Sequence, residues 1–198
     1  MASPSFSSLW SPQHFGNNDG GVRTGMAGNW SAEPTDCNVF GTGVLTRFID
    51  KEPCWSGLLY TNRMVQNLLD HESFDELTQP YEFSDMEAEH GNPHMWVSGH
   101  MTALPCAPLD PFFFCHHAFV DMLVERLRDT LPAGAWRYPN SMFIPWQHRW
   151  NDRMKPFDFI NADGLNDDKI GKNYVYEISP HDDPCSKHSD CSTTGSLL

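Results

Sequence analysis

His90 and His94, in the segment His90-Gly-Asn-Pro-His94, have residue types and a spacing that could bind a metal ion. Side chains four residues apart share one face of a helix, with Cβ atoms about 5–6 Å apart. Two imidazoles placed in this way can each bring a ring nitrogen to about 2 Å from one metal ion. Histidine pairs of this spacing also occur on solvated helix faces, so the pair alone is a weak signal.

A third candidate ligand lies 23 residues later, in the run Phe112-Phe-Phe-Cys-His116-His117. A buried imidazole needs a partner, because an unpaired buried polar group costs about 1–3 kcal/mol. One of these two histidines could bond a backbone carbonyl in the core while the other binds a metal. Asp121, four residues after His117, could orient a ligand ring or pair with an arginine instead. Three imidazoles suit copper, and zinc is also stable in such a site.

Three helices are predicted around these histidines. The first covers residues 58–69, where apolar residues recur at helical spacing. The second covers 82–97, with a kink or restart near Asn92 because Pro93 lacks an N–H group. The third begins at Asp110-Pro111, a good N-cap followed by a proline suited to the first helical position, and runs to about Arg128.

The remaining segments show weaker patterns. Residues 1–55 are rich in glycine and polar residues and predict irregular loop, and 74–77 predict a short helix. Residues 135–180 look mixed, with short extended pieces such as 174–178, and a polar tail follows from residue 179. The 198 residues suit one ordinary domain with a buried core.

Charge and hydropathy exclude two classes of partner. The 26 acidic and 13 basic side chains give a net charge of −13, which repels phosphate backbones and anionic headgroups. We therefore expect no nucleic acid and no membrane as partners. No apolar run approaches the roughly 20 residues of a membrane span. The first residues lack a signal-peptide pattern, so the sequence is either untargeted or a piece of a longer protein.

The six cysteines indicate the redox conditions of the compartment in which the protein works. Their even number and the late pair Cys185-x5-Cys191 favour a secreted, oxidising setting. The connectivity stays open. Buried reduced thiols remain the alternative, above all for Cys115 inside the apolar run.

Two motifs together resemble the second copper site of the tyrosinase family, which includes catechol oxidases and molluscan haemocyanin units. They read His90-Gly-Asn-Pro-His94-Met-Trp-Val-Ser-Gly-His-Met and Leu109-Asp110-Pro111-Phe-Phe-Phe-Cys-His116-His117-Ala-Phe-Val-Asp121. The resemblance extends over nearly all of residues 1–191. It implies a mainly α fold with long loops, half of a four-helix bundle, and short extended pieces toward the C-terminus. Residues 1–178 would form a partial copper domain, and 179–198 a polar, cysteine-containing tail.

The resemblance also implies a role for each matching residue. His90, His94 and His117 would bind one copper ion, and His116 would be their structural neighbour. Phe113 would shield the site and stack on a ligand ring. The Asp121 carboxylate would orient the His117 ring without binding the metal.

Three further positions concern the substrate. Glu87 would be the catalytic acid that holds a water near the copper, with Glu82 as a second candidate, and Leu104 would guard substrate entry. The chain departs from the family where Gly91 replaces the usual asparagine, with Asn92 one place late. Because that asparagine assists in deprotonating monophenols, the departure disfavours monophenol oxidation.

A complete family domain oxidises phenols or catechols with dioxygen at two coppers, each held by three histidines. The other histidines of this chain do not show such a second trio; they are His14, His71, His100, His148, His181 and His188. We therefore expect one copper on this chain, with self-association or an upstream half-domain to complete the centre and cover apolar side chains such as Phe112 and Phe119. Two alternatives stay open: a non-catalytic, secreted acidic copper-binding or matrix protein, and a haemocyanin-like oxygen-binding unit.

Overall fold

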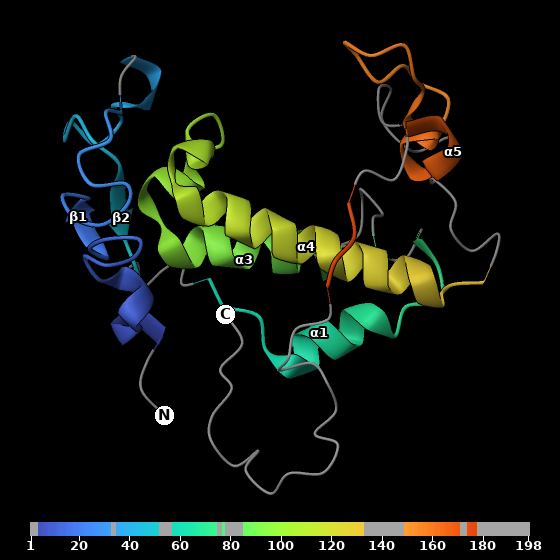
Figure 1. Ribbon diagram of the computed structural model, residues 1–198, viewed down its shortest axis with the longest axis horizontal. Coiled ribbons are helices and arrows are strands. Elements are labelled where there is room, and N and C mark those ends of the chain that lie inside the picture. The colour runs from blue at the N-terminus through green and yellow to red at the C-terminus, as the bar shows by residue number, and fades with distance from the viewer. Residues whose placement is uncertain are drawn as a thin grey trace, which may run out of the picture. The chain divides into compact units, whose positions relative to one another are not determined.

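Helices joined by long loops make up most of the chain, which confirms the predicted mainly α fold (Figure 1). The computed structural model describes residues 4–32, 35–51, 57–74, 77, 85–132, 149–170 and 174–177. The contacts divide the chain into two compact units, one of residues 1–72 and 76–131 and one of 73–75 and 132–198. The histidine motifs all belong to the first unit.

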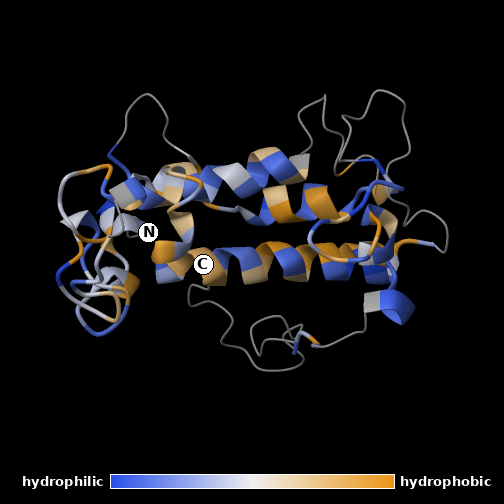
Figure 2. Ribbon diagram, turned by 90° about the horizontal axis from the view of Figure 1, so that it is seen from above, coloured by the Kyte–Doolittle hydropathy of each residue, from blue (hydrophilic) through white to orange (hydrophobic). Residues whose placement is uncertain are grey.

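The longest helix, α4 (Pro111–Thr130), begins where the sequence predicts. An Asp110 carboxylate oxygen accepts the Phe112 N–H at 3.0 Å, and Pro111 occupies the first helical position, where its missing N–H costs nothing. The helix ends at Thr130 with Leu131 as C-cap, directly before Pro132. Polar and apolar segments alternate along the ribbons of the helices in Figure 2, as expected where one side is buried and the other exposed.

Helix α3 (Asp85–Val97) runs through Pro93 without a break. The predicted restart near Asn92 is therefore wrong. Proline removes one hydrogen bond from the helix, but Pro93 and most of the last turn that follows it are buried, and their packing keeps the segment helical. Residues 82–84 of the predicted helix lie outside the described residues.

Helix α1 (Asn62–Leu69) starts four residues later than the apolar pattern indicates. Thr61 is the N-cap, and its hydroxyl accepts the Met64 N–H at 3.2 Å. Gly57 lies against α3 so closely that a Cβ there would be 1.9 Å from the Asn92 carbonyl oxygen. Phe74 and Leu77 are both helical, as predicted for 74–77, and the two residues between them lie outside the described part.

The first 50 residues contain more order than the predicted irregular loop. Strands β1 (Asp19–Gly21) and β2 (Thr46–Phe48) pair antiparallel, with Gly20 opposite Arg47. A disulfide between Cys37 and Cys106 links this region to the loop that precedes α4. Cys115 has a free thiol, as the alternative of reduced cysteines allows, but this thiol is exposed and not buried.

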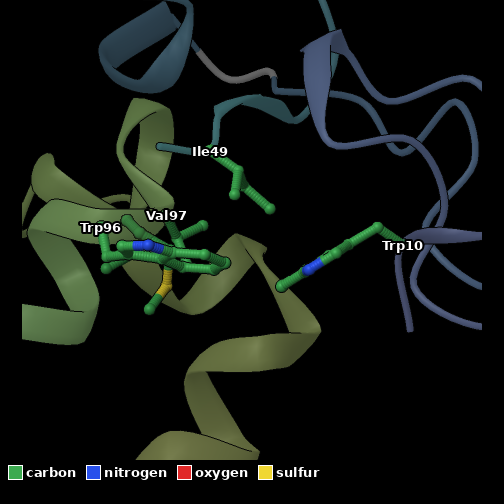
Figure 3. Packing of buried hydrophobic residues seen from close by; sticks show 6 residues of the cluster. Trp10, Ile49, Trp96 and Val97 are labelled. Atoms are coloured by element: carbon green, nitrogen blue, oxygen red, sulfur yellow. The ribbon is translucent and has the colours of Figure 1, made fainter. Parts of the chain in front are cut away.

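The strands and helices of the first unit share an aromatic core (Figure 3). Trp10 and Trp96 point toward each other with ring centroids 6.1 Å apart, and Ile49 and Val97 pack with them. Gly99 is needed beside this core because its φ of 59° is left-handed and a Cβ would lie 2.2 Å from the Thr46 carbonyl oxygen. The core therefore sets the position of α3 relative to β2.

The second unit is described in part. It contains a 3-10 helix (Asn161–Leu165) followed by the short helix α5 (Asp167–Ile170). Residues 174–177 are described but belong to no strand, and residue 178 of the extended piece predicted over 174–178 lies outside the described residues. The tail from residue 179 lies outside them. No described helix is long and apolar enough to cross a membrane.

Candidate metal centre

Helices α3 and α4 bring four histidines together, as His90 and His94 on one and His116 and His117 on the other. One ring nitrogen from each lies within 4.8 Å of the others. The ring centroids of the predicted ligands are 5.0 Å apart for His90 and His94, 4.9 Å for His90 and His117, and 5.3 Å for His94 and His117. The structure thus unites the predicted trio across the two helices.

The ring of His94 is held in one orientation. Its Nδ1 lies 2.7 Å from the Met101 carbonyl oxygen, which accepts only, so Nδ1 carries the proton and donates it. The other nitrogen, Nε2, then has a free lone pair and lies 3.2 Å from Nε2 of His117. This is the pairing of a ligand histidine whose second nitrogen is bonded to a backbone carbonyl.

His90 completes the donor set with a buried nitrogen. Its Nε2 is buried and has no hydrogen-bond partner among the described residues. Its Nδ1 lies 3.7 Å from a carboxylate oxygen of Glu87. A buried ring nitrogen without a partner, next to two others that converge, matches what a copper or zinc ion requires. The residues present therefore fit a metal held by three imidazoles.

His116 uses its Nε2 differently. This nitrogen donates to the His90 carbonyl oxygen at 2.9 Å. The buried ring stacks between Phe112 and the ring of His90, with interplanar angles of 4° and 3°. His116 therefore joins α4 to the backbone of α3 beside the ligand trio.

Burial disfavours the charged form of three histidines of the cluster. Desolvation lowers the pKa of His117, and the neighbouring His90 and His94 lower it further. Burial also lowers the pKa of His90, against the opposing effect of Glu87, and lowers the pKa of His116 to about 4. Neutral imidazole is the form that binds metals, so the protein holds these rings ready for an ion.

The other predicted site residues differ in how far their side chains are exposed. Phe113 covers the ring of His117, with centroids 4.0 Å apart. The Glu87 side chain is 82% exposed, and Leu104 is 84% exposed in the loop before α4. Asp121 is half-buried one turn beyond His117, and Glu82 lies outside the described residues.

The departure at Gly91 has a structural counterpart. The Asn92 side-chain amide donates to Glu89 at 3.2 Å, whereas the acid nearest the ligand ring is Glu87. A Cβ at Gly91 would meet nothing within 4 Å. The asparagine one place late thus bonds a different carboxylate from the one predicted to hold water.

Several residues that support the site were not found from sequence. His100 is fully buried, accepts the Thr46 N–H at 2.8 Å and donates to the Cys37 carbonyl oxygen at 2.7 Å. The Tyr60 hydroxyl is buried without a partner among the described residues, and desolvation together with Glu89 and Glu87 raises its pKa. Arg47 forms a buried ion pair with Asp110, a residue the sequence identifies only as a helix cap. The pattern that could have drawn attention to Arg47 is a charge inside the apolar run Val44-Leu-Thr-Arg-Phe-Ile49.

Comparison with known proteins agrees with the site. The sequence profile of the common central domain of tyrosinase matches residues 16–129, which include all four clustered histidines. The chain belongs to the tyrosinase family.

Three relatives illustrate how far the similarity extends. A tyrosinase-like protein of Caenorhabditis elegans is 29% identical over 188 residues, which are 87% of this chain and 26% of the relative. Tyrosinase-like protein 2 of Margaritifera margaritifera is 31% identical over 190 residues, 87% of this chain and 41% of the relative. The tyrosinase of Streptomyces glaucescens is 30% identical over 179 residues, 81% of this chain and 61% of the relative. The chain thus spans less than two thirds of the length of each.

Proposed function

We propose that this chain binds one copper ion through His90, His94 and His117 and is the copper-binding part of an oxidoreductase that acts on phenols or catechols with dioxygen. The observation that carries the proposal is the convergence of three ring nitrogens, of which His90 Nε2 is buried without a partner among the described residues. Membership of the tyrosinase family favours copper over zinc.

The residues around the ligands have distinct tasks in this proposal. A bound copper ion would supply redox chemistry and would accept a substrate oxygen. Met101 keeps the His94 lone pair directed at the ion through its carbonyl, and Phe113 excludes water from the His117 side. Glu87 is exposed enough to take a proton from an arriving phenol, and Leu104 borders the approach. Because Asn92 bonds Glu89 instead of Glu87, we propose diphenols over monophenols as substrates.

Copper titration tests the first part of the proposal. The apo chain should saturate near one equivalent of Cu²⁺, which should give the electron paramagnetic resonance (EPR) spectrum of an isolated ion with nitrogen ligands. His94→Ala serves as the matched control and should remove this spectrum. Saturation at two equivalents with an EPR-silent, coupled pair would contradict the single-ion proposal.

A second candidate is a secreted, acidic copper-binding protein without catalysis. The Cys37–Cys106 disulfide favours an oxidising compartment, and the net charge of −13 suits an extracellular acidic protein. A further alternative, a haemocyanin-like oxygen-binding unit, would use the same ligands. Catechol oxidation by a reconstituted two-copper form separates them, because only the oxidoreductase turns diphenols over.

Completion by another chain is a separate proposal. Phe114 is 60% exposed on α4, and exposed apolar side chains of this kind promote association. Phe112 and Phe119 are half-buried, with Phe112 against Trp10 and Phe119 against Tyr60. Sedimentation velocity should show self-association that weakens in Phe114→Ser. A monomer at every concentration would exclude it.

A further inference from the structure

An ion pair between Arg47 of β2 and Asp110, the N-cap of α4, is the most deeply buried charged contact of the described residues. Both side chains are 0% exposed. The guanidinium makes a two-pronged contact, with Nε 2.6 Å and a terminal nitrogen 2.7 Å from the two carboxylate oxygens. This fork geometry fixes the relative orientation of both groups and not only their separation.

The pair also makes hydrogen bonds to the backbone. Arg47 donates to the carbonyl oxygens of Phe15 and Asn17, at 2.8 and 3.4 Å. Asp110 accepts the Phe112 N–H at 3.0 Å. The pair thus connects the N-terminal segment, β2 and the first turn of α4.

A buried ion pair is weak evidence for stability, since well-packed apolar residues of similar volume often serve a fold as well. The role of such a pair is better explained by the orientation that its geometry imposes on the elements it joins. Here the pair fixes where α4 begins and how the helix is rotated about its axis.

The rotation of α4 matters because its next turn carries the metal site. Phe113 lies four residues before His117 and covers its ring at 4.0 Å. Phe112 lies four residues before His116 and packs on Trp10, with ring centroids 5.5 Å apart. Trp10, which faces Trp96 of α3 in Figure 3, also lies under the Arg47 guanidinium at 5.3 Å. The ion pair and the ligand turn therefore share one packed network.

We propose that Arg47 and Asp110 are positioning residues that direct His117 toward His90 and His94 for metal binding. The inference rests on the proposed copper site. Neither residue touches the metal; each acts through the first turn of α4. A rotation of that turn would separate the Nε2 atoms of His117 and His94, which are 3.2 Å apart.

The test compares copper binding in variants of the full chain. The double variant R47M/D110N removes both buried charges and leaves an asparagine, which caps helices as well as aspartate does. Its Cu²⁺ dissociation constant, measured by chelator competition, should rise about tenfold or more, as for other residues that orient ligands. Its EPR parameters should shift as well, because the ligand field changes when one imidazole is misplaced. Arg47→Lys keeps the charge without the fork and should show the same changes to a smaller degree.

Leu127→Ala is the matched control, because it removes a fully buried side chain from the same helix ten residues beyond His117. It should lower the unfolding midpoint but leave the dissociation constant and the EPR spectrum unchanged. Equal binding and an unchanged spectrum in R47M/D110N would overturn the inference, as would an equal loss in Leu127→Ala. If R47M/D110N does not fold, as judged by circular dichroism, Arg47→Lys decides between the same outcomes. Failure of the unaltered chain to bind Cu²⁺ would overturn the proposed site itself, and the inference with it.

Discussion

Each of the three proposed ligands has a different neighbour. A backbone carbonyl holds His94, an aromatic ring covers His117, and a carboxylate lies beside His90. His116 is equally close, but its Nε2 donates to the His90 carbonyl oxygen, so only its Nδ1 is left for a metal. At the scale of single residues, then, hydrogen bonding fixes which ring nitrogen each histidine can offer, and the resemblance to the tyrosinase family separates His117, the proposed ligand, from His116.

This difference predicts opposite results for two alanine substitutions. His94→Ala removes a ligand and should weaken Cu²⁺ binding by more than about a hundredfold, beyond the loss seen when orienting residues are changed. His116→Ala breaks the bond to α3 and leaves a cavity, and should lower the free energy of unfolding by about 1–3 kcal/mol. Its Cu²⁺ affinity should stay within about tenfold of the unaltered chain.

Chelator competition and urea unfolding measure the two quantities. An equal loss of copper in both variants, with stability untouched, would reverse the assignment of His116 and make it a ligand. His116→Gln, whose amide can still donate to the His90 carbonyl, should recover part of the lost stability.

Helix α3 forms despite two residues that oppose helices. Pro93 removes one backbone bond, and Gly91 adds conformational freedom to the unfolded chain. Burial of the following turn against Trp10 and Ile49 offsets both costs. At the scale of elements, tertiary packing decides where a helix continues.

Gly91→Ala should therefore stabilise the chain. The new Cβ meets nothing within 4 Å, and alanine favours a helix interior over glycine by about 0.5–1 kcal/mol. The free energy of unfolding in urea should rise by that amount.

Gly57→Ala is the matched control. Its Cβ would lie 1.9 Å from the Asn92 carbonyl oxygen, so the same substitution should lower stability. A loss of stability in Gly91→Ala would show that α3 has less room at this position than the structure indicates.

Across the first unit, long-range contacts join the N-terminal strands to the metal-binding helices. The Cys37–Cys106 disulfide closes a segment of 69 residues, and His100 bonds the Cys37 carbonyl from the loop beside it. That loop also contains Met101, whose carbonyl orients His94. Stability and ligand geometry are thus connected at the scale of the whole unit.

Removing the disulfide should be costly. Cys37→Ala combined with Cys106→Ala frees a long loop in the unfolded chain and should lower the free energy of unfolding by about 2–4 kcal/mol. Urea unfolding under oxidising conditions measures this.

Cys115→Ser provides the comparison, because Cys115 is free and exposed, and its stability should match that of the unaltered chain. If the two sets of variants proved equally stable, the disulfide would not constrain the unfolded chain.

Local chemistry made the shared helix face of His90 and His94 and the start of α4 predictable, whereas the choice of His117 over His116 came from the resemblance to the tyrosinase family. Helical periodicity places His90 and His94 on one face, and the Asp110-Pro111 pair marks the first turn of the helix that carries His117. These features depend on residues within a few positions of one another.

Other features depend on partners far along the chain. Arg47 meets Asp110 across 63 residues, Thr46 meets His100 across 54, and the two cysteines meet across 69. Neither spacing nor propensity reports such contacts, because they form only when the strands and helices pack around the shared aromatic core. The orientation of His94 by the Met101 carbonyl also depends on tertiary structure, although only seven residues separate them, because a 3-10 helix after α3 (Gly99–Thr102) brings them together. Periodicity places the candidate histidines on their helix faces, whereas packing sets the directions in which their nitrogens point.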